Sequence, residues 1–130
     1  MCYIFYSIYG ISLEGWIVRV LFYKTASGRE PVREYINDLE EDDKSDIVKD
    51  IELIEKYGIR AAPVVTRKLQ GNKFKGKLWE IKTGSGHQQR IFYCMESGQI
   101  MVLLHACKKQ KQGGQAEDLF VALKRMKDVL

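Results

Sequence analysis

Apolar residues recur at a helical spacing in the first half of the chain. Two stripes lie between residues 27 and 58, with apolar side chains three and four positions apart. They consist of Val32, Tyr35, Ile36 and Leu39, and of Ile47, Val48, Ile51 and Ile54. Ser27 is expected to cap the first helix, Pro31 fits its first turn, and Gly58 is expected to end the second helix. The short polar linker between the stripes predicts an antiparallel helix hairpin.

Strand-like patterns flank this hairpin on both sides. Residues 16–25 are rich in β-branched and aromatic side chains, and residues 78–83 alternate apolar with polar positions. Residues 89–95 and 99–107 are predicted to be two further strands, so that short turns join three strands into an antiparallel meander. Residues 59–77 are expected to be irregular. Residues 115–130 predict an amphipathic helix that buries Leu119, Leu123 and Met126.

The predicted order of elements is β-α-α-β-β-β-α, which indicates an α+β fold. We expect the helix hairpin to cover one face of the sheet and the other face to be free for binding. At 130 residues the chain fits one domain, assigned to residues 17–130. Residues 1–16 are interpreted as an N-terminal arm or an extra strand. They are shorter than the ~20 residues of a membrane helix and lack the basic start of a secretory signal.

Charge is distributed unevenly along the chain, whose net charge is +4. Residues 29–57 hold eleven acidic and five basic side chains, whereas residues 60–112 hold two acidic and eleven basic ones. The basic half favours a polyanionic partner, although a solvated lysine surface explains the same count. The three cysteines, an odd number without a CxxC pair, argue against a disulfide framework and against a structural zinc site. They fit a reducing cytoplasm, and we expect no metal and no cofactor.

The candidate chemistry is a set of basic residues on neighbouring predicted strands. The sequence has no phosphate-binding loop, dinucleotide fingerprint, HExxH or GxSxG motif. Arg90, one residue into an apolar strand, holds either an oxyanion or Glu80 across the hairpin. Lys109 shares strand parity with His105 and Cys107, whereas Lys108 faces the other way. The full catalytic set predicted is Arg90, Lys109, Lys82, Lys111, His87 and His105.

Such a basic set suits cleavage of an RNA phosphodiester by its own 2′-OH. Lysine and arginine stabilise the charge that builds on the phosphate oxygens, while a base and an acid move two protons. His87 lies in a turn and can reach a ligand, whereas His105 lies in an apolar strand, where packed histidines are common. Tyr93 or Phe92 can stack on bases, provided that it does not face the core. The RNA-binding positions expected are Lys73, Lys75, Lys77, Lys108 and Tyr93.

Three segments resemble the RelE/ParE toxin superfamily, and most of all its HigB-like, phage-derived branch. They are "LFYKTASGREPVREYINDLEED", "KLWEIKTGSGHQQRIFYCMESGQIMVLLHACKKQKQ" and "AEDLFVALKRM". The resemblance implies the toxin of a type II toxin–antitoxin pair, a metal-independent, ribosome-dependent mRNA endoribonuclease. It also implies inhibition by a cognate antitoxin, usually a helix-turn-helix DNA-binding protein. By position, Lys82, Arg90 and Lys109 match the basic residues of RelE-like strands.

Two departures from the superfamily pattern leave the general base open. Glu80 stands where RelE-like members can carry a second lysine, and residues 115–119 lack the tyrosine that some members have in the last helix. His87, His105 and Lys111 are the candidates that remain. The same fold also serves ParE-like gyrase inhibitors, which generally lack the basic strand residues. An inactive relative that only binds antitoxin or nucleic acid is the third reading.

Overall fold

A single five-stranded sheet organises the chain in the computed structural model, which describes residues 17–60, 62–110 and 116–130. The strand order is β1-β5-β4-β3-β2, with β1 parallel to β5 and the other pairs antiparallel. The elements are β1 (Arg19–Phe22), α1 (Pro31–Asn37), α2 (Glu41–Tyr57), β2 (Val65–Lys68), β3 (Trp79–Thr83), β4 (Gln89–Ser97), β5 (Ile100–Lys108) and α3 (Ala116–Val129). Short 3-10 turns span Asn72–Phe74 and Ser85–His87. The predicted α+β class and the β3-β4-β5 meander are confirmed, and the predicted arm, residues 1–16, lies outside the described residues.

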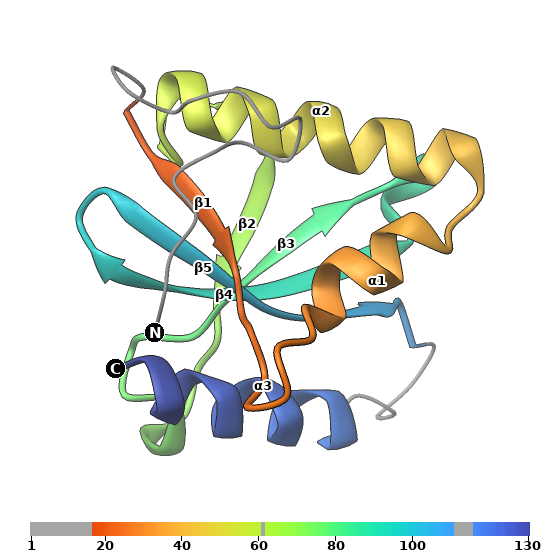
Figure 1. The fold of residues 1–130 in the computed structure, drawn as a ribbon. Helices are drawn as coiled ribbons and strands as arrows, with labels where there is room; N and C mark the ends of the chain where they lie inside the picture. Colours follow the sequence, from red (N-terminus) through yellow and green to blue (C-terminus); the bar gives the residue numbers. More distant parts are fainter. Residues whose placement is uncertain (1–16, 61, 111–115) are drawn as a thin grey trace.

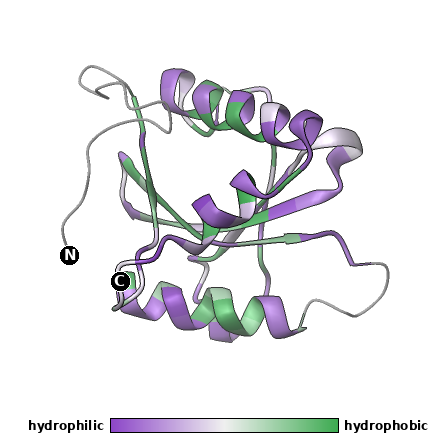
Figure 2. Cartoon of the chain, turned by 45° about the vertical axis from the view of Figure 1, so that its right-hand side comes forward, coloured by the Kyte–Doolittle hydropathy of each residue, from purple (hydrophilic) through white to green (hydrophobic). Residues whose placement is uncertain are grey.

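Helices cover both faces of the sheet, as Figure 1 shows. The hairpin of α1 and α2 packs on one face, where Ile47, Ile51 and Ile54 meet Ile81 and other strand residues in one apolar cluster. The expectation that the opposite face is free is wrong, because α3 lies across it. The predicted stripe of α3 needs a partner, and the sheet supplies the nearest apolar surface. In Figure 2 hydrophobic residues, drawn in green, lie along parts of the strands and alternate with hydrophilic ones along the helices.

The helix ends differ from prediction in one place. Gly58 ends α2 with a φ of 83°, and its N–H bonds to the carbonyl of Ile54, as predicted. Ser27 is not the cap of α1, which begins at Pro31 after Glu30. The Ser27 hydroxyl instead lies 3.0 Å from that of Thr25, within the turn that follows β1.

Residues 59–77 contain a strand that the prediction of an irregular segment missed. β2 pairs with β3 in antiparallel register, with Thr66 opposite Ile81 and Arg67 opposite Glu80. Three of its four residues are exposed because β2 lies at the edge of the sheet. Its side chains therefore lack the apolar alternation by which strands are recognised. In the described segments, no helix has both the length and the apolar composition needed to cross a bilayer.

The turn between β3 and β4 is fixed by α2. The Ser85 amide donates to Asp43 Oδ1 at 2.8 Å, and the Thr83 hydroxyl donates to Asp50 Oδ2 at 2.6 Å. Gly84 has a φ of 78°, and a Cβ there would lie 2.6 Å from Gln89 Cγ and 3.0 Å from Asp43 Oδ1. The turn therefore requires glycine at this position.

Gly84→Ala should lower the free energy of unfolding by about 2 kcal/mol, because it combines an unfavourable φ with a steric clash. Urea unfolding followed by circular dichroism measures the loss. Gly98→Ala is the matched control, since a Cβ there meets nothing within 4 Å. Equal stability of the two variants would contradict this account of the turn.

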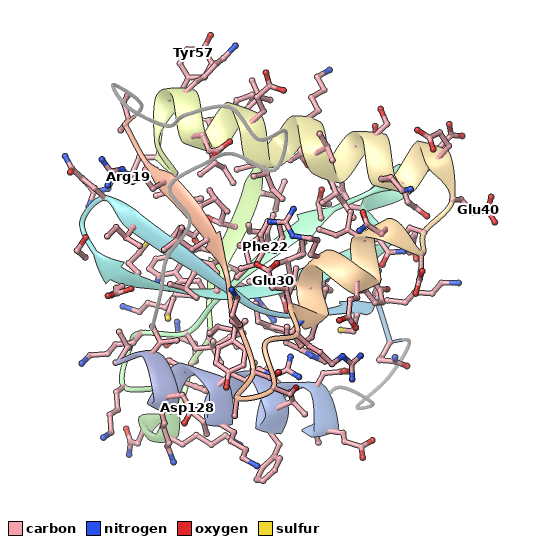
Figure 3. All side chains as sticks on the ribbon, viewed as in Figure 1. Arg19, Phe22, Glu30, Glu40, Tyr57 and Asp128 are labelled. Carbon is pink, nitrogen blue, oxygen red and sulfur yellow. The ribbon has the colours of Figure 1, made fainter. Side chains whose placement is uncertain are left out.

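Glu55 is a buried carboxyl on the sheet side of α2, with no exposed surface. Tyr57, two residues later, is exposed and points away from the sheet (Figure 3). Neither carboxyl oxygen of Glu55 has a well-aligned hydrogen-bond partner within the described chain. Burial raises the pKa of Glu55 to about 8, nearby Glu52 adds to the rise, and the Val20 amide opposes it. The folded protein therefore holds this carboxyl protonated at neutral pH.

The raised pKa makes stability fall as pH rises from about 4.5 to about 8, because the unfolded chain releases a proton that the folded chain keeps. Glu55→Gln should abolish this dependence and stabilise the fold by about 4 kcal/mol at pH 8, with little change at pH 4. Thermal melts across this range test the effect, with Glu52→Gln as the control on the same helix. A Glu55→Gln variant that is less stable than the parent at pH 8 would disprove it.

Candidate functional site

Three of the chemically interesting strand residues lie side by side on the face that α3 covers in part. Lys82 on β3 is the register partner of Arg90 on β4, which in turn pairs with Cys107 on β5. Directly opposite residues of antiparallel strands project to the same face. The next row on this face is Glu80, Phe92 and His105. The sheet therefore brings together side chains that lie up to 27 positions apart in sequence.

Arg90 is held by the protein itself. The side chain is 93% buried, and Nη1 donates to the carbonyls of His87 at 2.6 Å and Gln89 at 3.1 Å. Its Nε lies 3.8 Å from Glu80 Oε1. Of the two partners predicted for Arg90, the structure contains the one within the chain, Glu80. The guanidinium fixes the β3–β4 turn and balances a buried carboxylate.

Glu80 is the acidic centre of this face. It is 99% buried, and its Oε1 also lies 3.5 Å from Nη2 of Arg67 on β2. Its Oε2 has no hydrogen-bond partner among the described residues. Two arginines therefore share one carboxylate oxygen, which keeps the carboxylate paired despite its burial.

Lys82 and Lys109 are the accessible cations beside Arg90. Lys82 is half-buried, and within the described chain no carboxylate lies at salt-bridge distance from it. Lys109 is exposed directly after β5, and its backbone N–H donates to the carbonyl of Gln88 at 2.7 Å. This bond places Lys109 beside the β3–β4 turn that carries His87. We call Lys82, Arg90 and Lys109 the basic face.

The two histidines differ in availability. His87 is exposed in the turn, with a φ of 55°. His105 is half-buried, and its Nε2 lies 2.7 Å from Oδ1 of Asp118 in the first turn of α3. Its Nδ1 lies 3.4 Å from Nη1 of Arg125, which also donates to the Leu104 carbonyl at 2.8 Å. Both ring nitrogens of His105 are thus engaged by α3.

Tyr93 and Phe92, the rings predicted to stack on bases, are both buried in this structure. Tyr93 lies on the α2 side of the sheet, 6.3 Å from the Trp79 ring, and burial raises the pKa of its hydroxyl to about 12. Phe92 lies on the α3 side, in the apolar cluster beneath that helix. Phe92 is therefore covered, whereas Tyr93 lines a pocket of about 540 Å³ with Trp79 and Thr66, and its contact with RNA stays a prediction.

The other predicted RNA-binding residues lie away from the basic face. Lys73, Lys75 and Lys77 line a pocket of about 200 Å³ together with Lys127 near the end of α3. Asp118 lies in the first turn of α3, and Lys127 follows it by nine residues, which places the pocket about 14 Å along the helix from the end that faces His105. Lys108 faces the other side of the sheet, in a shallow pocket with Tyr35 and Asp43. Lys111 lies outside the described residues.

Asp118 and Arg125 are the site residues that sequence reasoning missed. Asp118 falls within residues 115–119, where only a tyrosine was sought, and it carries an acidic side chain of the kind expected in any first helical turn. Its approach to His105 depends on how α3 crosses the sheet, which no local pattern encodes. The sole sequence signal was the alternation of His105 with Cys107, which predicts that they share a face.

The architecture and this face define a small α+β protein with a group of basic side chains at one end of its sheet. A family model described as "Phage derived protein Gp49-like (DUF891)" matches residues 34–127, most of the chain, so the chain belongs to the Gp49-like family. This is a family of toxin–antitoxin toxins in the RelE/HigB-like superfamily, generally of the RNase type, and membership implies an antitoxin partner. A search of curated proteins finds no match. The predicted superfamily is confirmed, and the HigB-like branch stays a prediction.

Proposed function

We propose that this protein is the toxin of a type II toxin–antitoxin pair and cleaves mRNA on the ribosome. The observation that carries the proposal is the pairing of Lys82 with Arg90 on neighbouring strands, with Lys109 beside the adjoining turn, in a chain of the Gp49-like family. The site of action is the cytoplasm, where the translating ribosome presents the messenger. The cognate antitoxin, of the helix-turn-helix class, blocks the basic face.

Cleavage proceeds by attack of the 2′-OH on the adjacent phosphorus, with departure of the 5′-oxygen. Negative charge grows on the two non-bridging oxygens, and Lys82 and Lys109 stabilise it from the solvent side of the basic face. Arg90 acts from its buried position. Its Nη1 bonds hold the β3–β4 turn in place, and its charge adds positive potential to the site. Its Nη2, which makes neither of these bonds, is the group that contacts the phosphate in this proposal. The positive charge that the reaction requires comes from these side chains.

His87 is our candidate for the group that moves the protons. Its backbone carbonyl accepts from Arg90, so the residue lies next to the basic face, and its side chain is exposed. His105 is less suited, because Asp118 and Arg125 occupy both of its ring nitrogens. An imidazole has one nitrogen that can accept a proton and one that can donate it, which suits a group that both takes and returns a proton.

The lysine pocket formed by Lys73, Lys75, Lys77 and Lys127 supports contact with a longer stretch of RNA. A distance of about 14 Å corresponds to a few nucleotides of single strand. These lysines would hold the backbone away from the scissile bond and contribute affinity without sequence specificity.

Induced expression in a bacterial host, with 5′-end mapping of transcripts, tests the proposal. We expect growth arrest together with new cuts inside translated reading frames. Growth arrest with intact messengers would refute the nuclease. In that case a supercoiling assay with purified gyrase tests the ParE-like inhibitor. Unaffected growth would instead indicate an inactive relative.

A further inference from the structure

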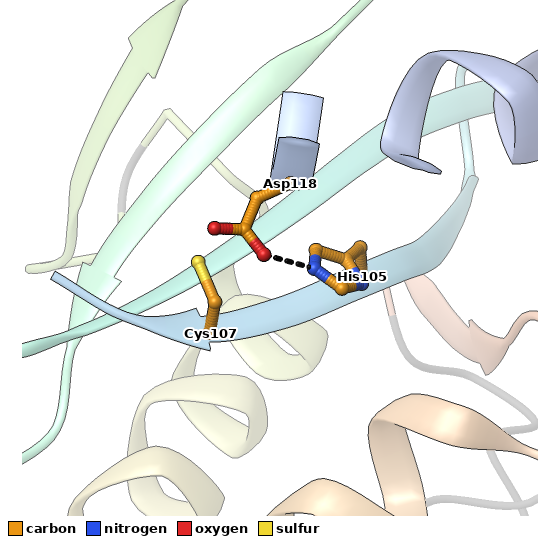
Figure 4. Close-up of side chains that lie close together, drawn as sticks. All are labelled: His105, Cys107 and Asp118. Atoms are coloured by element: carbon orange, nitrogen blue, oxygen red, sulfur yellow. Dashed lines mark hydrogen bonds and ion pairs between the residues drawn. The ribbon is translucent and has the colours of Figure 1, made fainter. Parts of the chain in front are cut away.

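Three side chains of metal-ligating type meet where the end of β5 faces the start of α3. His105 and Cys107 alternate along β5 and project to the same face, and Asp118 approaches them from the first turn of α3, as Figure 4 shows. One ligand atom from each residue lies within 4.8 Å of the other two. No other group of three or more His, Cys, Asp or Glu side chains in the described part of the chain has this geometry.

We propose that His105, Cys107 and Asp118 form a three-ligand site for a divalent metal ion of the zinc type. Imidazole nitrogen, thiolate sulfur and carboxylate oxygen are the donor set that Zn²⁺ prefers, and three protein ligands leave a fourth position for water. The site is independent of the proposed nuclease activity, since it uses neither Lys82 nor Lys109.

Small side-chain movements would bring the three ligand atoms to the separations that a zinc ion requires. Ligands of a tetrahedral zinc ion lie roughly 3.5 Å apart, as follows from bonds of about 2.0 to 2.3 Å. The widest separation, at most 4.8 Å, has to close by about 1 Å. The Asp118 and His105 atoms, now 2.7 Å apart across a shared proton, have to open by a similar amount as the ion replaces that proton. The side chains of both residues are about one-fifth exposed, which leaves a path for the ion.

Binding replaces the thiol proton of Cys107. Burial raises the pKa of this thiol to about 12, with Asp118 adding to the rise, and the groups around it are Asp118, Glu80, Arg90 and Tyr35. An ion next to the sulfur supplies the positive charge that stabilises the thiolate and offsets the two carboxylates. Each bound ion therefore releases about one proton from Cys107.

Arg125 has to move away from His105 when the ion binds. A histidine that binds an ion through Nε2 carries its proton on Nδ1, and Arg125 Nη1 lies 3.4 Å from that atom. The same Nη1 makes its shorter bond, 2.8 Å, to the carbonyl of Leu104, and this bond is unaffected. The longer contact is the one that loosens.

Titration calorimetry of the whole chain with zinc chloride tests the site, in a Cys2→Ser background that leaves Cys94 as the single thiol outside it. We expect one ion per chain, and at least a 100-fold loss of affinity in Cys107→Ala and in Asp118→Asn. Cys94→Ala is the matched control, because Cys94 is buried in the same apolar cluster beneath α3 as Cys107 but belongs to no group of possible metal ligands among the described residues. Circular dichroism establishes that each variant is folded.

Cobalt provides the second readout. Co²⁺ bound to the parent should show the near-ultraviolet charge-transfer band of a thiolate ligand, and Cys107→Ala should lose that band while Cys94→Ala keeps it. Failure of the folded parent to bind zinc, or equal zinc affinity in Cys107→Ala and Cys94→Ala, would overturn the proposal. A cobalt complex without the thiolate band would overturn it as well.

Discussion

Lys82→Ala should lower the rate of mRNA cleavage by about 100-fold or more and leave the free energy of unfolding nearly unchanged. Lys82 is half-buried on β3, opposite Arg90. Within the described chain no carboxylate lies at salt-bridge distance from it, so the substitution leaves no carboxylate unpaired. Removing its ammonium group takes away transition-state stabilisation and little packing. The measurement is the fraction of a messenger cut per unit time in a translation reaction.

Lys49→Ala is the control for Lys82→Ala, since it removes the same charge from the exposed side of α2, in the layer opposite α3. It should retain full activity. If Lys82→Ala cuts as fast as Lys49→Ala, the basic face is not where the phosphate binds.

Arg90→Ala should lower the free energy of unfolding by about 3 kcal/mol. The change leaves Glu80 buried with only the exposed Arg67 as its partner, and it frees two carbonyls in the β3–β4 turn. The burial of Arg90 makes its side chain part of the turn as well as of the site.

A double-mutant cycle measures how much of the stability loss in Arg90→Ala comes from the pairing of Arg90 with Glu80. Glu80→Gln removes the carboxylate charge, so Arg90→Ala should cost about 1–2 kcal/mol less in that background. Urea unfolding of the four proteins gives the coupling energy. A stability loss below about 0.5 kcal/mol for Arg90→Ala in the parent would contradict the structural role.

The sequence predicted the elements whose apolar pattern is strong. The stripes of α1 and α2 and the mostly buried strands β3, β4 and β5 all have one face in a core, and burial is what produces the pattern. β2 escaped prediction because an edge strand such as Val65–Lys68 buries almost nothing. The covered second face was missed because the stripe of α3 shows that the helix docks without showing where.

The candidate site was predicted in its composition and less well in its geometry. Strand alternation correctly groups Lys82 with Glu80, and His105 with Cys107. It cannot show that Arg90 turns inward to Glu80 and to two carbonyls, or that Asp118 meets His105 from another layer. Those contacts depend on tertiary packing, and they changed the interpretation of both residues.

A reconstituted translation reaction with purified components tests the central claim most directly. The purified protein should cut a messenger while ribosomes translate it, leave the same RNA intact when ribosomes are omitted, and lose this activity in Lys82→Ala. A messenger that stays intact under translation, with protein that is folded and free of antitoxin, would contradict the account.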